Sequence, residues 1–117
     1  MRADALGRLG EDVALAYFRM QGYECRDRRW RRGGGEIDLV VGRGDTTVFV
    51  EIKTRGAGSW GRARESVHPR QLRRLRRLAG RWCAEHRHGS QLRLDVVAID
   101  LPPGGRGLVL EHFPGVG

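Results

Sequence analysis

Three charged residues lie in two strand-like, apolar segments where a buried strand should tolerate no charge. Asp38 lies within residues 35–41, and Glu51 and Lys53 lie within residues 48–53. Because burying an unpaired charge costs several kcal/mol, such charges have partners, a metal ion or an open end. Two carboxylates at this spacing suit a hard divalent cation such as Mg²⁺. The ion would lower the pKa of a bound water, and a neighbouring lysine could orient that water or neutralise phosphoryl oxygens.

This chemistry requires two adjacent strands. Side chains two apart on a strand share a face, so Glu51 and Lys53 point the same way, as do Glu36 and Asp38. If the strands pair as an antiparallel hairpin, Asp38 and Glu51 converge and Lys53 reaches the same point. The alternative is an exposed Glu51–Lys53 salt bridge, since Glu-x-Lys often arises by chance. The apolar surroundings favour a site, as does the fact that Lys53 is the only lysine among 22 basic residues.

The composition predicts one domain over residues 1–117, with a core at about 5–100 and an extra strand and tail in 101–117. The net charge of +8 and pI of about 11.1 favour a polyanionic partner, although a merely basic, soluble surface is the alternative. We expect a cytoplasmic protein without membrane contact, because no apolar run approaches ~20 residues and no signal-like segment opens the chain. Cys25 and Cys83 match no zinc or redox motif.

Residues 5–21 show the three- and four-residue spacing of an amphipathic helix, which Gly22 would stop. The side chains predicted for its buried face are Leu6, Leu9, Val13, Ala16, Tyr17 and Met20. Glu11 lies among small residues, which would let the backbone pack closely beside its carboxylate. An ordinary solvated helix carboxylate is the alternative for Glu11.

A second helix is predicted between the third and fourth of five strands, which gives the order αβββαβ plus one strand. The predicted strands are 23–31, 36–42, 47–54, 92–100 and 107–113, and the helix is 69–87. This is an α/β fold with a mixed central sheet flanked by helices. The fourth strand is reached through a helix, so it should run parallel to the third. The glycine-rich segment 55–66, which contains Trp60, is predicted to be a mobile loop.

The second helix has one apolar and one strongly basic face. Pro69 suits its first position, with His68 or Ser66 near the cap. The residues predicted to be buried are Leu72, Leu75, Leu78, Ala79, Trp82 and Cys83. The basic face carries Arg70, Arg73, Arg74, Arg76, Arg77, Arg81 and Arg87. A solvated face is the ordinary alternative, but so many arginines with almost no acid between them favour phosphate contacts.

The arrangement of Asp38 with Glu51, Ile52 and Lys53 resembles the D…(D/E)-x-K signature of the restriction-endonuclease-like nucleases, whose αβββαβ core matches the predicted order. Over about residues 7–100 the chain resembles the small bacterial family called YraN-like, which is related to archaeal Holliday junction resolvases. The matching blocks are residues 10–11, 22–23, 35–39, 49–55, 60–61 and 93–97.

The resemblance implies a nuclease-type site that uses Mg²⁺ or Mn²⁺. Asp38 and Glu51 would be metal ligands and catalytic residues, the Ile52 carbonyl would complete the ligand set, and Lys53 would be the catalytic ammonium. Glu11 would reach the same metal from the first helix. Glu36 and Gln71 would contact the metal ligands without binding the metal themselves. The chain departs from the family pattern where Gln71 replaces a frequent lysine and Arg29 replaces a frequent asparagine, and glutamine supplies no charge.

We therefore expect a metal-dependent DNA endonuclease. A narrower version of this hypothesis is an endonuclease selective for branched or flap DNA. The residues expected to bind nucleic acid are Arg31, Arg55, Arg70, Arg73, Arg74 and Arg77. The alternative is a non-catalytic nucleic-acid-binding module with a nuclease-like fold, and a weaker one is a protein-interaction domain. Resolving a four-way junction would require two active sites and hence a homodimer, although no residues in the sequence identify a dimer face.

Overall fold

The computed structural model describes residues 3–55, 67–87, 91–100 and 107–117. Their elements are α1 (Ala3–Met20), β1 (Glu24–Arg32), β2 (Gly35–Arg43), β3 (Thr46–Arg55), α2 (Pro69–His86), β4 (Gln91–Asp100) and β5 (Val109–Phe113). The predicted order of elements is confirmed, with each boundary within a residue or two. The glycine-rich loop predicted beyond Arg55, with Trp60, lies outside the described residues.

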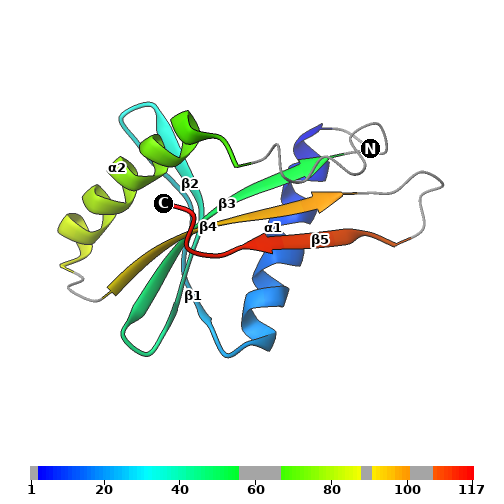
Figure 1. Ribbon diagram of the computed structural model, residues 1–117, viewed down its shortest axis with the longest axis horizontal. Helices are drawn as coiled ribbons and strands as arrows, with labels where there is room; N and C mark the ends of the chain where they lie inside the picture. Colours follow the sequence, from blue (N-terminus) through cyan, green and yellow to red (C-terminus); the bar gives the residue numbers. More distant parts are fainter. Residues whose placement is uncertain (1–2, 56–66, 88–90, 101–106) are drawn as a thin grey trace.

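The five strands form one mixed sheet in which spatial order follows chain order, as Figure 1 shows. Only the β3–β4 pair is parallel among the described strands, because α2 carries the chain back across the sheet between them. The two helices cover opposite faces. On β4, Leu94 packs in the core beneath α2, whereas Val97 packs in the core beneath α1. This is the mixed α/β architecture expected of a restriction-endonuclease-like core.

Helix α1 buries a different stripe from the one predicted. Ala14, Leu15 and Phe18 are its buried side chains, whereas Ala16 is exposed and Met20 is 88% exposed. The prediction was wrong by about one residue around the helix, because apolar side chains occupy two adjacent stripes. The sheet covers the stripe that includes Leu15 and Phe18, which removes more apolar area from water than Ala16 would. The remaining predicted positions, Val13 and Tyr17 among them, are partly buried.

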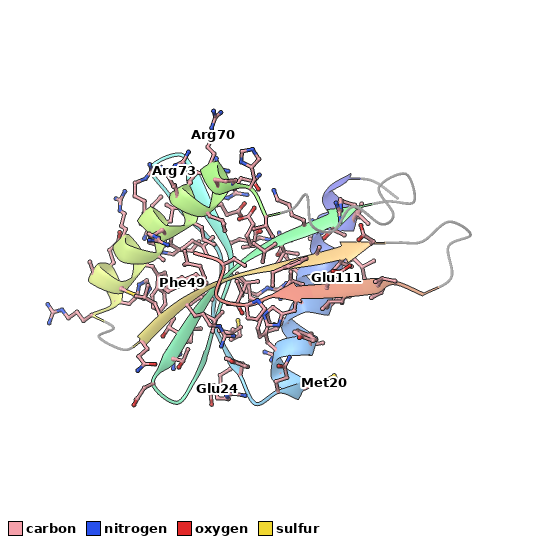
Figure 2. All side chains as sticks on the ribbon, in the orientation of Figure 1. Met20, Glu24, Phe49, Arg70, Arg73 and Glu111 are labelled. Carbon is pink, nitrogen blue, oxygen red and sulfur yellow. The ribbon has the colours of Figure 1, made fainter. Side chains whose placement is uncertain are left out.

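Helix α2 follows its prediction closely. His68 caps it, since its Nδ1 accepts a hydrogen bond from the Arg70 N–H at 3.2 Å, and Pro69 occupies the first turn. The buried side chains are Leu75, Leu78, Ala79 and Trp82, whereas Leu72 and Cys83, also predicted to be buried, are partly buried. Arg70 and Arg73 point away from the sheet into solvent (Figure 2). Neither α1 nor α2, the helices of the described chain, combines the length and apolar character that crossing a bilayer requires.

A buried carboxylate joins the C-terminal segment to the sheet. Asp95 is fully buried on β4 and accepts two hydrogen bonds from the Arg93 guanidinium, both at 2.9 Å, and one from the Gly115 N–H at 3.1 Å. His112 on β5 lies between Asp95, at 2.6 Å, and the Tyr17 hydroxyl of α1, at 2.9 Å. Burial alone would raise the pKa of Asp95, but the His112 and Arg93 contacts outweigh it and lower that pKa.

Gly10 allows α1 to approach β3 closely. A Cβ built on Gly10 would clash with the Thr54 side chain, whereas at Gly7 no described atom beyond its own helix lies within 4 Å. We predict that Gly10→Ala lowers the free energy of unfolding by about 1–3 kcal/mol, as overpacking does. Gly7→Ala, the matched control, should raise it by up to about 1 kcal/mol through helix propensity. Urea unfolding of both variants measures the difference, and equal effects would contradict the close approach.

Candidate active site

The sheet opens between β2 and β3 at the position of the predicted site. Backbone pairing of these strands ends at Leu39 and Val50, while β3 stays paired with β4 to the end of both strands. From Glu51 onward β3 therefore has no β2 backbone partner. The Asp38 side chain spans the opening, and its Oδ2 accepts a hydrogen bond from the Ile52 N–H at 2.8 Å. A carboxylate thus satisfies a backbone donor that a paired strand would otherwise satisfy.

The same opening provides a backbone oxygen. The N–H and C=O of one strand residue point to the same side of the strand. Since the Ile52 N–H is directed at Asp38, we expect the Ile52 carbonyl to face the opening as well. Two carboxylates and a carbonyl would then converge there, which is the oxygen-rich donor chemistry that Mg²⁺ and Mn²⁺ prefer.

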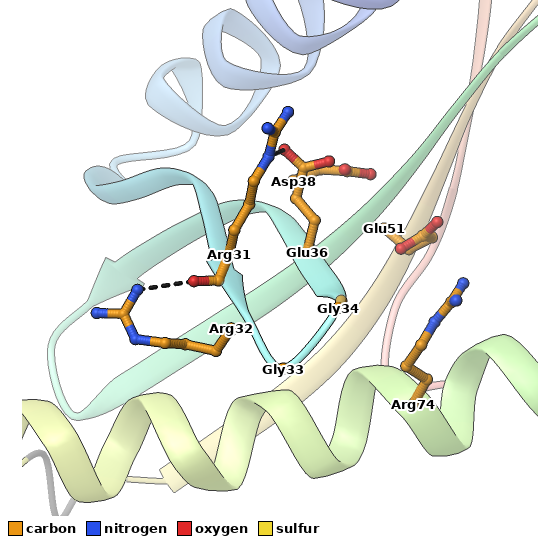
Figure 3. Close-up of a pocket in the computed structure, with 9 residues that line it drawn as sticks. Arg31, Arg32, Gly33, Gly34, Glu36, Asp38, Glu51 and Arg74 are labelled. Carbon is orange, nitrogen blue, oxygen red and sulfur yellow. Dashed lines mark hydrogen bonds and ion pairs between the residues drawn. The ribbon is translucent and has the colours of Figure 1, made fainter.

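Two clefts meet at Asp38. The cleft on the α2 side has a volume of about 530 Å³ and is lined by the glycine turn 33–35, by three arginines and by three carboxylates (Figure 3). The charged residues are Arg31, Arg32, Arg74, Glu36, Asp38 and Glu51. The cleft on the α1 side has about 340 Å³ and includes Glu11, Ile52 and Lys53 together with Asp38. The opening in the sheet therefore gives Asp38 access to both clefts.

Burial and several surrounding acidic side chains raise the pKa of Asp38. Its pKa is raised to about 7, first by burial and then by the charge of Glu51, with smaller contributions from Glu36 and Glu11. The hydrogen bond from the Ile52 N–H acts in the opposite direction and only partly offsets the increase. The fold thus holds several carboxylates close enough to repel one another, an arrangement that a bound cation would relieve.

Three of these carboxylates have a basic partner. Lys53 Nζ lies 3.3 Å from Glu51 Oε1, and Arg31 Nε lies 3.4 Å from Glu36 Oε1. Glu11 Oε1 lies 2.6 Å from Arg29 Nε. Among the described residues, Asp38 has no ion pair. No three His, Cys, Asp or Glu side chains of the described chain gather closely enough to form a ready-made metal site, and Glu11 is engaged by Arg29 instead.

A third cleft, of about 490 Å³, lies on α2. It is lined by His68, Arg70, Gln71, Arg73, Arg74 and Arg77. Gln71 therefore lies with the arginines and not in either carboxylate cleft. Arg74 lines both this cleft and the larger carboxylate cleft, so it connects the basic face of α2 to the opening in the sheet.

The arginines differ in their pairing. On β1, Arg28, Arg29, Arg31 and Arg32 each pair with a carboxylate. No carboxylate in the described part of the chain pairs with Arg70, Arg73, Arg74, Arg76 or Arg77 on α2. The excess positive charge of the described chain is therefore concentrated on α2.

Arg55, predicted to bind nucleic acid, pairs with a buried carboxylate at the end of β3. Its Nε lies 2.9 Å from Asp100 Oδ1, and its Nη2 donates a hydrogen bond to Asp100 Oδ2 at 3.1 Å. Asp100 is buried, so much of the Arg55 charge is balanced within the fold. Arg55 lines none of the three clefts.

Sequence reasoning did not identify the pairing of Arg29 with Glu11, or the role of residues 33–35 in lining a cleft. The pairing joins α1 to β1 across 18 positions of the chain, so no local periodicity reveals it. The available signal was a run of arginines on an edge strand that follows a helix with two adjacent carboxylates, Glu11 and Asp12. The glycines were predicted only as a turn.

The raised pKa of Asp38 predicts how the stability of the protein depends on pH. Its folded pKa of about 7 exceeds the ~3.9 expected in the unfolded chain, so between these values only the folded state keeps the proton. The free energy of unfolding should therefore fall as pH rises from about 4 to 7. Asp38→Asn removes this loss and keeps an oxygen for the Ile52 N–H. We expect it to stabilise the protein by up to about 4 kcal/mol at pH 8, and by less than half of that at pH 5.

The control is Asp12→Asn, which removes a carboxylate of α1 whose side chain is 67% exposed. Its effect should stay within about 0.5 kcal/mol at both pH values, as for ordinary surface substitutions. Urea unfolding at pH 5 and pH 8 measures all three proteins. If the stability difference between Asp38→Asn and the parent protein is the same at pH 5 and pH 8, the pKa of Asp38 is not raised in the folded protein.

Comparison with known proteins identifies the family of the chain. The model of the uncharacterised protein family UPF0102 matches residues 10–99. A UPF0102 protein of Frankia casuarinae is 50% identical over 117 residues, which cover 98% of both chains. A UPF0102 protein of Beutenbergia cavernae is 48% identical with complete coverage of both chains, and one of an Arthrobacter species is 44% identical with the same coverage. The chain therefore belongs to the UPF0102 family, the YraN-like group related to Holliday junction resolvases.

Proposed function

We propose that this protein is an endonuclease that uses Mg²⁺ or Mn²⁺ to cleave DNA. The observation that carries the proposal is the opening between β2 and β3, where Asp38 faces Glu51 and Lys53 is 3.3 Å from that second carboxylate. A purely structural salt bridge would not require a neighbouring aspartate with a pKa near 7. Arg74 connects this opening to Arg70, Arg73 and Arg77, which pair with no carboxylate among the described residues, and this favours a phosphate-containing substrate.

Each side chain has a role in this proposal. Asp38, Glu51 and the Ile52 carbonyl hold the cation, which when bound lowers the pKa of a water and balances charge on the phosphate. Lys53 orients the attacking water or neutralises a phosphoryl oxygen from beside Glu51. Glu36, paired with Arg31, keeps that arginine at the cleft where it can contact the scissile strand.

The face of α2 holds the nucleic-acid backbone in this proposal. Arg70, Arg73 and Arg77 line one cleft, and Arg74 extends from it into the carboxylate cleft. A strand bound along these arginines would lead into the opening where cleavage occurs. Selectivity for branched or flap DNA is the finer form of the proposal, and resolution of a four-way junction would require a homodimer that presents two openings.

A second candidate function is nucleic-acid binding without cleavage. The observations in its favour are the engagement of Glu11 by Arg29 and the uncharged Gln71 among the arginines of α2. Such a module keeps the basic face and needs no metal. Salt-dependent DNA binding without turnover in Mg²⁺ or Mn²⁺ would favour it over the endonuclease.

The endonuclease proposal predicts cleavage of at least one DNA in a panel of linear, flap and four-way substrates with Mn²⁺. Asp38→Asn and Lys53→Ala should each lower the rate by about a hundredfold or more, because each removes a group that acts on the reacting phosphate. Asp12→Asn, the matched surface carboxylate, should keep the parent rate. Gel analysis of end-labelled DNA measures cleavage, with circular dichroism to confirm folding. Retained cleavage in both site variants would refute the assignment.

The basic face generates a separate prediction for binding. The triple variant Arg70→Gln, Arg73→Gln and Arg77→Gln should weaken DNA binding and flatten the slope of log K against log salt by about 0.9 for each phosphate that is no longer neutralised. The control removes the same charge on the α1 side through Arg19→Gln, Arg28→Gln and Arg43→Gln. Fluorescence anisotropy between about 50 and 200 mM salt measures both variants. An equal decrease in affinity for the two would mean that net charge alone accounts for the binding.

A further inference from the structure

Arg29 holds the one carboxylate that α1 contributes to the site region. Its Nε donates a hydrogen bond to Glu11 Oε1 at 2.6 Å. The neighbouring Arg28 lies 3.7 Å from the same oxygen and pairs mainly with Asp12, at 2.8 Å. The Glu11 side chain is 13% exposed and the Arg29 side chain 39% exposed, so the carboxylate is mostly covered while the guanidinium side of the contact is open to water.

The backbone at Arg29 is unusual. Its φ is +50°, the left-handed region that a non-glycine residue on a strand rarely adopts. This conformation occurs on β1 between residues paired with β2, beside the opening that contains Asp38. This backbone conformation is unfavourable for a non-glycine residue, and it occurs at the residue whose side chain contacts Glu11. Strained backbone conformations of this kind are concentrated at functional sites.

The Arg29–Glu11 contact bears on the predicted metal site because of where Glu11 lies. Glu11 lines the same cleft as Asp38, Ile52 and Lys53, and its charge adds to the repulsion felt by Asp38. Even so, it does not join Asp38 and Glu51 in a three-carboxylate cluster within the described chain. Arg29 pairs with this carboxylate through its Oε1.

We propose that Arg29 is a latch on Glu11, whose guanidinium withholds this carboxylate from the metal site until a divalent cation displaces it. The inference rests on the proposed function, because it assumes that Asp38 and Glu51 bind a cation. The guanidinium and a cation compete for the same carboxylate, so the strength of the Arg29–Glu11 contact reduces metal affinity. Arg29 thereby sets the cation concentration at which the site is complete, and acts as a positioning residue.

Direct Mn²⁺ binding tests the latch without any cleavage assay. Arg29→Asn suits the test, because asparagine tolerates the left-handed backbone and lacks the guanidinium. Releasing Glu11 should tighten Mn²⁺ binding about tenfold, the effect of removing one competing charge-assisted hydrogen bond. Electron paramagnetic resonance of free Mn²⁺ measures the dissociation constant. An unchanged or weaker affinity would overturn the inference.

Two controls separate a latch from the simple removal of a nearby positive charge. Arg28→Asn removes an arginine with nearly the same exposed fraction, 38% against 39%, and should change affinity by no more than about twofold. The second control repeats Arg29→Asn in a Glu11→Gln background, where a latch has nothing to release. Tightening that persists there at full size would show a through-space charge effect and overturn the latch.

The outcome also separates this inference from the function on which it rests. If the parent protein binds Mn²⁺ and Asp38→Asn abolishes binding, but Arg29→Asn has no effect, only the latch fails. If neither the parent protein nor any variant binds millimolar Mn²⁺, the metal-dependent function fails and the latch fails with it. Thermal unfolding of each variant confirms that the fold is retained.

Discussion

The hydrogen bond from the Ile52 N–H to Asp38 is the interaction on which the site depends. Where β2 and β3 separate, a backbone donor would lose its partner, and leaving it unsatisfied in a half-buried position would cost free energy. A side chain with an acceptor oxygen is therefore needed there. A serine or asparagine could also accept this bond, but an aspartate brings a charge that burial and Glu51 make costly. This unfavourable buried charge is located where the two clefts meet.

The distribution of basic side chains follows from the same constraint. On β1, Arg29 and Arg31 pair with Glu11 and Glu36 beside the opening, so these charges are balanced within the protein. On α2, Arg81 pairs with Glu85, but no carboxylate among the described residues pairs with Arg70, Arg73, Arg74, Arg76 or Arg77. One set of arginines therefore stabilises the acidic region, and the other set leaves a positive field for an external anion.

The sequence predicted the order of elements, the parallel β3–β4 pair and the buried face of α2, because these depend on local periodicity and chain connectivity. It misplaced the face of α1, where Ala16 and Met20 compete with Leu15 and Phe18 for the sheet and only tertiary packing decides. It predicted that Asp38, Glu51 and Lys53 would lie together if the strands paired. The separation of β2 from β3, the Arg29–Glu11 contact and the Arg55–Asp100 pair depend on long-range geometry that no local pattern encodes.

Residues 93–97 have a structural role that is independent of chemistry. Arg93 and His112 enclose the fully buried Asp95, and Tyr17 connects that group to α1. Strand β4 is thereby fixed against both β5 and α1. Since β3 beyond Glu51 pairs in the sheet only with β4, among the strands of the described chain, this network also fixes the position of Glu51 and Lys53. A substitution at Asp95 would therefore disturb the site through the strand that supports it, although no atom of Asp95 lines either carboxylate cleft.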